Sequence, residues 1–420
     1  MTVIGIDDTD SRERGMCTTY LAARVADRLA GDYTVDRRVL VRLNPAVEHK
    51  TRGNAALAIH TDAPPESALE TVLADLDLAE TEDPRTNPGV VVAPDDPRAV
   101  PDAVVAFARQ AVRDHHALAD ARAMIDDHGY ESRKAGNGRG LIGALAAIGA
   151  WRAFEDWTYE DISYRDRERR GTPREVDRES VFSAADRAYP EAWDTVDHGE
   201  GELVCVPHTP GPILHGIRGD DREAVEQAAS EIDGEPVERR ALFVTNQGTD
   251  AHLQDGEIAT VRDGRSYCVT GTIVDTPETH EGGHVFLTLA DGDATLRCAA
   301  FEPTKRFRDR VRNLREGDRV TVCGEVSDGT LKLEKFAVRD RVTTERVTPT
   351  CPDCGRTMES AGRSQGYRCR DCGTDVDGKV ERAIERKLER GWYEVPPCAR
   401  RHIAKPLVRG GFDAPVHPER

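Results

Sequence analysis

The chain opens with Val3-Ile4-Gly5-Ile6, an apolar run that leads directly into the polar stretch Asp7-Asp8-Thr9-Asp10-Ser11. Residues 18–29 then place Leu21, Val25 and Leu29 at helical spacing. This order of strand, polar loop and helix predicts an α/β unit. Further strands are expected at residues 39–43, 55–59 and 89–93, and helices at residues 66–78 and 100–112. We therefore assign residues 1–133 to an N-terminal α/β domain.

Carboxylates follow the first strand at the point where its backbone turns. Side chains at the carboxyl end of a strand can face a cleft, and Asp7 and Asp8 are suited to hold a Mg²⁺ that bridges phosphates. Thr18 begins the next helix, where unpaired N–H groups and the helix dipole favour an anion. The alternative is an Asp-rich turn with Thr18 as an ordinary N-cap. These residues alone leave both interpretations open.

The next region begins with a glycine-rich stretch, Gly136-Asn137-Gly138-Arg139-Gly140-Leu141-Ile142-Gly143. It lacks the Gly-Lys-Ser/Thr of a Walker A loop, and as a bare motif it is weak evidence for a ligand lying close to the backbone. Strands expected near residues 203–207 and 241–245 bracket a helix at residues 222–232. We therefore predict an α+β domain at residues 134–252.

Short alternating strands separated by turn residues fill the stretch 257–339. Five or so such strands are typical of a small Greek-key barrel of the OB type, which we place at residues 253–343. A basic run interrupts the strands, with Lys305, Arg306, Arg308, Arg310, Arg312 and Arg315. In a chain this acidic, such a run indicates a segment that faces phosphates. The alternative is a solvated helix with only Asp309 and Glu316 as counter-charges.

Two C-x-x-C pairs follow the barrel, Cys351 with Cys354 and Cys369 with Cys372. Four thiolates at this spacing predict a closed tetrahedral Zn²⁺ site that stabilises a small fold rather than performing catalysis. We assign residues 344–420 to a zinc ribbon followed by a C-terminal helix. A barrel followed by a ribbon is a common way to hold single-stranded or looped nucleic acid.

The net charge of −18 argues at first sight against a polyanionic partner. Residues 341–420, however, hold 16 Arg and Lys against 12 Asp and Glu, so residues 1–340 carry −22. With few lysines and only 5% aromatic residues, the composition resembles that of proteins from salt-accumulating organisms. No apolar run is long enough to cross a bilayer. We expect a cytoplasmic protein without a membrane association, whose cysteines bind metal in a reducing compartment rather than form disulfides.

Three motifs together resemble one enzyme family: residues 4–11 with Gly15-Met16-Cys17-Thr18-Thr19-Tyr20, residues 136–140, and Phe301-Glu302-Pro303-Thr304-Lys305 in the barrel. Over essentially its whole length the chain is similar to the archaeal tRNA(Ile) 2-agmatinylcytidine synthetases. The resemblance implies a multidomain α/β and α+β protein with a kinase-like ATP-binding domain, a ferredoxin-like agmatine-binding domain, an OB-fold barrel and a zinc ribbon. It also implies an ATP-dependent ligase that attaches agmatine to C2 of the wobble cytidine in the CAU anticodon of tRNA(Ile). A phosphorylated C2 oxygen is the implied intermediate, and the modified tRNA reads AUA.

The resemblance also implies roles for individual residues. Asp7 and Asp8 would hold Mg²⁺ and the ATP phosphates, and Thr18 would accept a phosphoryl group. Further contacts with ATP are expected from Thr9, Asp10, Gly136, Asn137, Gly138, Arg139 and Gly140. Contacts with the cationic ends of agmatine are expected from Tyr159, Glu160 and Asp161. The expected partners are therefore the CAU-anticodon tRNA and agmatine, with no obligate protein partner.

Two other functions remain open at this point. A non-catalytic single-stranded nucleic-acid-binding protein accounts for residues 257–372 but leaves the first 250 residues unexplained. An ATP-dependent nucleotidyl- or acyl-transferase that acts on a small amine has no use for the barrel and the ribbon.

Overall fold

A single nine-stranded sheet runs through the N-terminal half of the computed structural model, which describes residues 1–11, 13, 15–48, 50 and 53–420. Its strand order is β5-β4-β1-β3-β2-β11-β6-β10-β7. The strands are β1 (Thr2–Asp7), β2 (Val35–Arg42), β3 (Ala55–Thr61), β4 (Gly89–Ala93), β5 (Glu131–Lys134), β6 (Thr158–Arg165), β7 (Ala192–Trp193), β10 (Ile213–Gly219) and β11 (Val237–Thr245). The expected α/β and α+β units therefore share one sheet.

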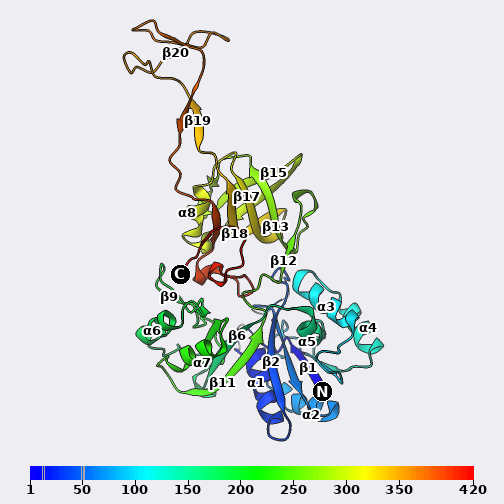
Figure 1. Cartoon of the computed structure of the whole chain (residues 1–420). Helices are drawn as coiled ribbons and strands as arrows, with labels where there is room; N and C mark the ends of the chain where they lie inside the picture. The colour runs from blue at the N-terminus through cyan, green and yellow to red at the C-terminus, as the bar shows by residue number, and fades with distance from the viewer. Residues whose placement is uncertain (12, 14, 49, 51–52) are drawn as a thin grey trace.

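The first part of the sheet is covered by helices on both faces, because its strands alternate apolar side chains in both directions. Helices α1 (Thr18–Leu29) and α2 (Pro65–Leu76) pack over Ile4 and Ile6 of β1. On the opposite face, α3 (Asp102–Arg113), α4 (Leu118–Asp127) and α5 (Gly140–Ala153) pack over Val3. Figure 1 shows these helices around the β1–β3 region.

The second part of the sheet has the ferredoxin-like arrangement. Helices α6 (Arg178–Ala188) and α7 (Arg222–Ser230) cover one face of the strands in the order β11-β6-β10-β7. A small hairpin, β8 (Val196–Asp197) with β9 (Glu202–Leu203), lies beside them. Strand β11 joins β2 in parallel at the pair Val244 and Val39. The expected boundary at residue 133 falls inside β5, and α5 packs on the first part of the sheet rather than the second.

Five strands close into the barrel predicted from the sequence. They are β13 (Arg265–Ile273), β15 (Val285–Asp291), β16 (Ala294–Ala300), β17 (Arg319–Ser327) and β18 (Thr330–Asp340). Parallel pairing of β16 with β18 completes the circuit of strands. Short strands β12 (Leu253–Asp255) and β14 (Glu278–Thr279) and helix α8 (Phe307–Arg312) flank the barrel.

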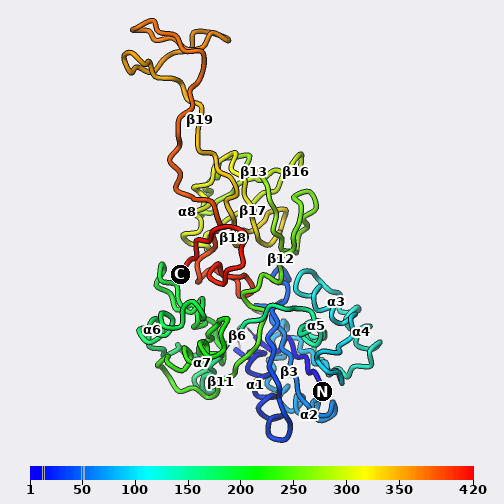
Figure 2. Tube along the Cα trace, viewed as in Figure 1, coloured from blue at the N-terminus to red at the C-terminus, as the bar shows by residue number. Residues whose placement is uncertain are grey.

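The zinc-ribbon segment projects from the barrel on a two-stranded stalk, as the tube in Figure 2 shows. The stalk pairs β19 (Thr344–Val347) with β23 (Val380–Ala383). Beyond it lies the small sheet β20 (Glu359–Ser360), β21 (Tyr367–Arg368) and β22 (Asp375–Val376). The ribbon is thus held away from the rest of the chain.

The expected C-terminal helix is wrong, because the described residues 344–420 contain only strands, loops and short 3₁₀ turns. Residues 381–390 are rich in helix-favouring Glu, Arg and Lys, yet the pairing of β23 with β19 overrides this local preference. The chain then returns to the barrel, where β24 (Gly391–Glu394) pairs with β18 and β25 (Val416–His417) pairs with β24. The last residues therefore lie between the barrel and the N-terminal half.

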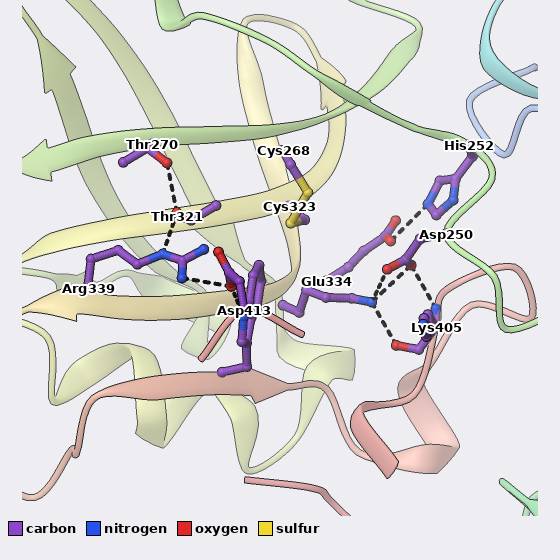
Figure 3. The surroundings of a disulfide bond; sticks show 12 residues. Asp250, His252, Cys268, Thr270, Thr321, Cys323, Glu334, Arg339, Lys405 and Asp413 are labelled. Carbon is purple, nitrogen blue, oxygen red and sulfur yellow. Dashed lines mark hydrogen bonds and ion pairs between the residues drawn. A yellow bond between two sulfur atoms is a disulfide. The ribbon is translucent and has the colours of Figure 1, made fainter. Parts of the chain in front are cut away.

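One cysteine pair departs from the expectation that the cysteines avoid disulfides. Cys268 on β13 lies directly opposite Cys323 on β17, and the two side chains form a disulfide across the strands (Figure 3). The 55 residues between them hide this pairing in the sequence. Among the described residues, no helix is long and apolar enough to cross a membrane.

Candidate functional site

A cavity of about 400 Å³ opens where the two parts of the large sheet meet. Its walls come from segments that are far apart in the sequence. The end of β1, the start of α1, and strands β2, β6 and β10 contribute Asp7, Thr18, Arg42, Glu160 and Arg218, respectively. The C-terminal tail also reaches the cavity. This convergence makes it the candidate active site.

One end of the cavity is acidic and formed by Asp7 and Asp8. Burial raises the pKa of the Asp7 carboxyl well above its usual value, and the adjacent Asp8 charge raises it further. Burial also raises the pKa of Asp8 to about 6, although Arg139 opposes that shift. Asp8 adopts a φ of 57°, a left-handed conformation that is uncommon outside glycine. Such conformations cluster at functional sites because the surrounding structure must maintain them.

Arg139 is the positive side chain that bonds to Asp8. Its guanidinium donates to Asp8 Oδ2 at 2.8 Å and to the Arg85 carbonyl at 2.7 Å. One guanidinium compensates only one of two buried carboxylates, so this pair favours further positive charge. Asp10 lines the same end of the cavity. Oxygen ligands beside incompletely balanced charge fit a Mg²⁺ that keeps waters and phosphates in its remaining positions.

The glycine-rich stretch has a mainly structural role. A Cβ at Gly143 would lie 2.0 Å from Asp7 Oδ2, and one at Gly140 would lie 2.5 Å from the Gly89 nitrogen. These glycines therefore let α5 approach the ends of β1 and β4. Gly136 and Gly138 have positive φ in the preceding turn, and the Asn137 backbone donates to Asn87 Oδ1. Of residues 136–140, only Arg139 lines the cavity.

Thr18 is the first residue of α1 and lines the cavity. The N-cap is Cys17, and its side chain makes no capping hydrogen bond. The interpretation of Thr18 as an ordinary N-cap is therefore wrong. Its hydroxyl oxygen instead accepts a hydrogen bond from the buried Thr9 hydroxyl at 3.1 Å. Thr9 thus positions Thr18 without lining the cavity itself.

The opposite end of the cavity holds polar residues that the sequence did not single out. Gln247 connects them, because its side-chain nitrogen donates to Glu160 Oε2 at 2.5 Å and its oxygen accepts from Arg42 at 3.1 Å. His402 Nδ1 lies 3.0 Å from the same oxygen. Arg218 is buried beside them, and one of its terminal nitrogens has no hydrogen-bond partner within the described part of the chain. These residues come from four distant segments, and no local motif marks them.

Alternation along β6 separates the three residues expected to contact agmatine. Glu160 faces the cavity, and Gly216 on β10 leaves room for its carboxylate, since a Cβ there would lie 2.9 Å from Glu160 Oε1. Asp161 faces the other side of the sheet and pairs with Arg240 at 3.1 Å. Tyr159 packs against the α6–α7 core. Tyr159 and Asp161 therefore cannot line this cavity, and only Glu160 remains a candidate.

The four ribbon cysteines come together as expected. The sulfurs of Cys351, Cys354, Cys369 and Cys372 all lie within 4.8 Å of one another. Each C-x-x-C pair is followed by a glycine at positive φ whose N–H donates to the carbonyl of the first cysteine at 2.9 Å. Two such turns present four thiolates to one point, which fits a closed tetrahedral Zn²⁺ site with no open position.

The basic run between the barrel strands is largely paired within the protein. Arg306 contacts Asp197 at 2.8 Å and Glu419 at 2.6 Å, and Arg312 contacts Asp309 at 2.6 Å. Arg308 lies 3.4 Å from Glu302. The expectation that Asp309 and Glu316 are the only counter-charges is therefore wrong, because tertiary structure brings in acidic residues from distant segments.

Family models match nearly the whole chain. They are the TiaS TCKD domain at residues 3–137, the TiaS FLD domain at residues 138–252, an OB-fold nucleic acid binding domain at residues 256–334, and the TiaS C-terminal zinc ribbon domain at residues 348–388. The order of these matches is the order of the units in the structure.

Individual relatives are similar over their full length. The 2-agmatinylcytidine synthetase TiaS of Haloquadratum walsbyi, named for its isoleucine tRNA, is 54% identical, with 100% of both chains covered. A solved complex of TiaS with its isoleucine tRNA and ATP has a TM-score of 0.90 and 42% identity, and the match covers 100% of this chain and 99% of that one. A complex of TiaS with the same tRNA, AMPCPP and agmatine has a TM-score of 0.87 and 39% identity, with 100% and 99% covered.

Proposed function

Because the chain belongs to the TiaS family, we propose that it is the ATP-dependent synthetase that attaches agmatine to C2 of the wobble cytidine of the CAU-anticodon tRNA(Ile). The observation that carries the proposal is the single cavity that joins Asp7, Asp8 and Thr18 to Glu160. A non-catalytic nucleic-acid-binding protein needs no such cavity, and a transferase without tRNA needs neither barrel nor ribbon. We place its action in the cytoplasm, where tRNA is modified.

The acidic end of the cavity is assigned to the phosphates of ATP. Asp7 and Asp8 would hold Mg²⁺, which neutralises phosphate charge during phosphoryl transfer. The Thr18 hydroxyl lies at the first turn of α1, where unpaired backbone N–H groups and the helix dipole favour an incoming phosphoryl group. Arg139 leaves or shares Asp8 as positive charge enters. These residues therefore position and neutralise phosphate rather than make a reactive group of their own, with Thr18 as the exception.

The reaction replaces a poor leaving group by a better one. Transfer of a phosphoryl group to the C2 oxygen of the cytidine turns that oxygen into part of a phosphate ester. The primary amine of agmatine then forms a bond to C2, the C2–O bond breaks, and phosphate departs with the electron pair. The amine loses a proton in this step, so it must reach C2 in its neutral form.

Glu160 is assigned to a cationic end of agmatine. Its carboxylate is buried in the cavity, and Gln247 holds it in place through a hydrogen bond. A buried carboxylate that faces a cavity favours a guanidinium or ammonium ligand, because the ion pair compensates the desolvation of both charges. Arg42 and Arg218 lie at the same end and favour the anionic substrates, so Glu160 is the acidic exception there.

Glu160→Gln should therefore raise the KM for agmatine by roughly 10- to 100-fold, since a hydrogen bond to a charged group contributes about 1.5–3 kcal/mol. Asp161→Asn is the matched control, because that carboxylate lies on the same strand but faces Arg240. Steady-state kinetics with varied agmatine and saturating tRNA and ATP measure the effect. An unchanged KM in Glu160→Gln, or an equal rise in Asp161→Asn, would contradict the assignment.

The ribbon is assigned to tRNA binding and not to chemistry. Cys351→Ser should remove the bound Zn²⁺ and weaken tRNA binding, because the ribbon depends on its metal for folding. Any ATP hydrolysis that proceeds without tRNA should survive. Metal analysis, tRNA affinity and AMP formation check these outcomes, with Asp353→Ser as a control inside the same C-x-x-C loop. Loss of tRNA-independent hydrolysis in an otherwise folded variant would show that the zinc takes part in catalysis.

A further inference from the structure

An aromatic cluster lies on the outside of the barrel. Phe286 on β15 and Phe301, directly after β16, have ring centroids 6.2 Å apart. His280 lies 4.6 Å from the Phe286 ring, and His284 lies 5.2 Å from the Phe301 ring. The Arg297 guanidinium lies over Phe286 at 4.1 Å from the ring centroid. We call these five residues the barrel platform.

The platform does not serve the barrel core. Residues Val285, Leu287 and Leu289 of β15 point inward and are buried, so the alternation of the strand directs Phe286 outward. Phe286 and Phe301 are both half-buried, and neither belongs to an apolar cluster of the described residues. In a chain with only nine phenylalanines, two on the outside of one small barrel are not explained by packing.

Cationic side chains flank the platform. Arg308 of α8 donates to the Gly283 carbonyl at 2.8 Å, and Arg312 donates to Thr279 Oγ1 at 3.0 Å. Both contacts attach the basic helix to the segment that carries His280 and His284. Exposed aromatic rings beside arginines suit a nucleic acid, since bases stack on the rings while the cations face phosphates.

We propose that the barrel platform stacks an unpaired nucleobase of the tRNA outside the anticodon. The inference rests on the proposed function for the identity of the nucleic acid. The cavity at residues Asp7, Thr18 and Glu160 takes the wobble cytidine, so the platform, which lies on a different domain, takes a second nucleotide. Strands β15 and β16 are the second and third strands of the barrel, and this face is the one on which OB folds hold oligonucleotides. The unpaired nucleotides available are the 3′ single-stranded end of the tRNA and its loops.

The test uses the full-length protein with Phe286→Leu and Phe301→Leu combined. Leucine keeps the apolar volume and removes the aromatic faces, so the fold is retained. The affinity for a CAU-anticodon tRNA transcript should fall by on the order of 10-fold, the range expected for loss of base–aromatic stacking. The control is Val274→Ala, which changes an exposed apolar residue outside the platform. At saturating tRNA, the double variant should still form the cytidine adduct.

A second measurement identifies the stacked nucleotide. Transcripts carry 2-aminopurine either in the 3′ single-stranded end or in a loop, and its fluorescence is quenched when the base stacks. Quenching by the wild-type protein that disappears in the double variant, at either position, supports the platform. Wild-type affinity and unchanged quenching in the double variant would overturn the inference and leave the proposed function intact. Absence of adduct with the wild-type protein would instead contradict the proposed function itself.

Discussion

Asp8→Asn is expected to reduce AMP formation and tRNA modification by about 10³-fold, which corresponds to about 4 kcal/mol of lost charge stabilisation at the transferred phosphate. Phosphoryl transfer depends on positioning and charge neutralisation, so removal of a metal-binding carboxylate damages it more than removal of a surface contact. Asn keeps the size of the side chain and loses its charge. tRNA affinity should remain at the wild-type value, because the barrel and the ribbon are unaltered.

The pKa of Asp8 separates this effect from a loss of folding. Burial raises that pKa to about 6, so the ionised carboxylate costs stability above pH 6, and the cost disappears as the pH falls and the group is protonated. Asp8→Asn should therefore fold at least as well as the wild type at pH 8. The same shift predicts that the Mg²⁺ affinity of the wild type weakens as the pH falls through about 6. Asp75→Asn is the control, since this buried carboxylate pairs with Arg24 and Arg28 away from the cavity.

Thr18→Ala gives the second large effect, a loss of turnover without a loss of the folded state. If Thr18 accepts a phosphoryl group, no other atom replaces its hydroxyl oxygen, and modification should fall by more than about 10²-fold. A purely structural Thr18 would lose only the hydrogen bond from Thr9, which is worth about 1 kcal/mol. Adduct formation and thermal unfolding, measured on the same preparation, distinguish the two roles.

Two further variants sharpen the Thr18 result. Thr9→Val removes the same hydrogen bond from the donor side and leaves the Thr18 hydroxyl in place. Thr18→Ser restores a hydroxyl at the first turn of α1. The acceptor role predicts that Thr9→Val and Thr18→Ser keep most of the activity while Thr18→Ala loses it. If Thr18→Ala modifies tRNA at the wild-type rate, the acceptor role is wrong.

Local sequence patterns were sufficient for the elements and for the fold class. The helix at residues 18–29 and the strand at residues 89–93 form as predicted, because apolar spacing and flanking turn residues agree there. The five barrel strands follow the same rule. The domain boundary at residue 133 could not be placed in this way, since the shared sheet depends on the pairing of β11 with β2 across more than 200 residues.

The site was predictable only where it lies on one continuous segment. Asp7, Asp8 and Thr18 sit on adjacent elements, and the cavity brings all three together. Arg218 and Gln247 reach the cavity only through long-range strand pairing, which no spacing reveals. Glu160 illustrates the limit, because the register of β6 decides which of three neighbouring polar residues faces the cavity.

The most direct test of the central claim is incubation of the protein with ATP, agmatine and a CAU-anticodon tRNA(Ile) transcript in high salt, followed by mass spectrometry of the nucleosides. The account predicts one new cytidine adduct, 2-agmatinylcytidine, with AMP formed in proportion and only when all three substrates are present. A protein that binds the transcript but yields no adduct, or that forms AMP from ATP and agmatine equally well without tRNA, would contradict it.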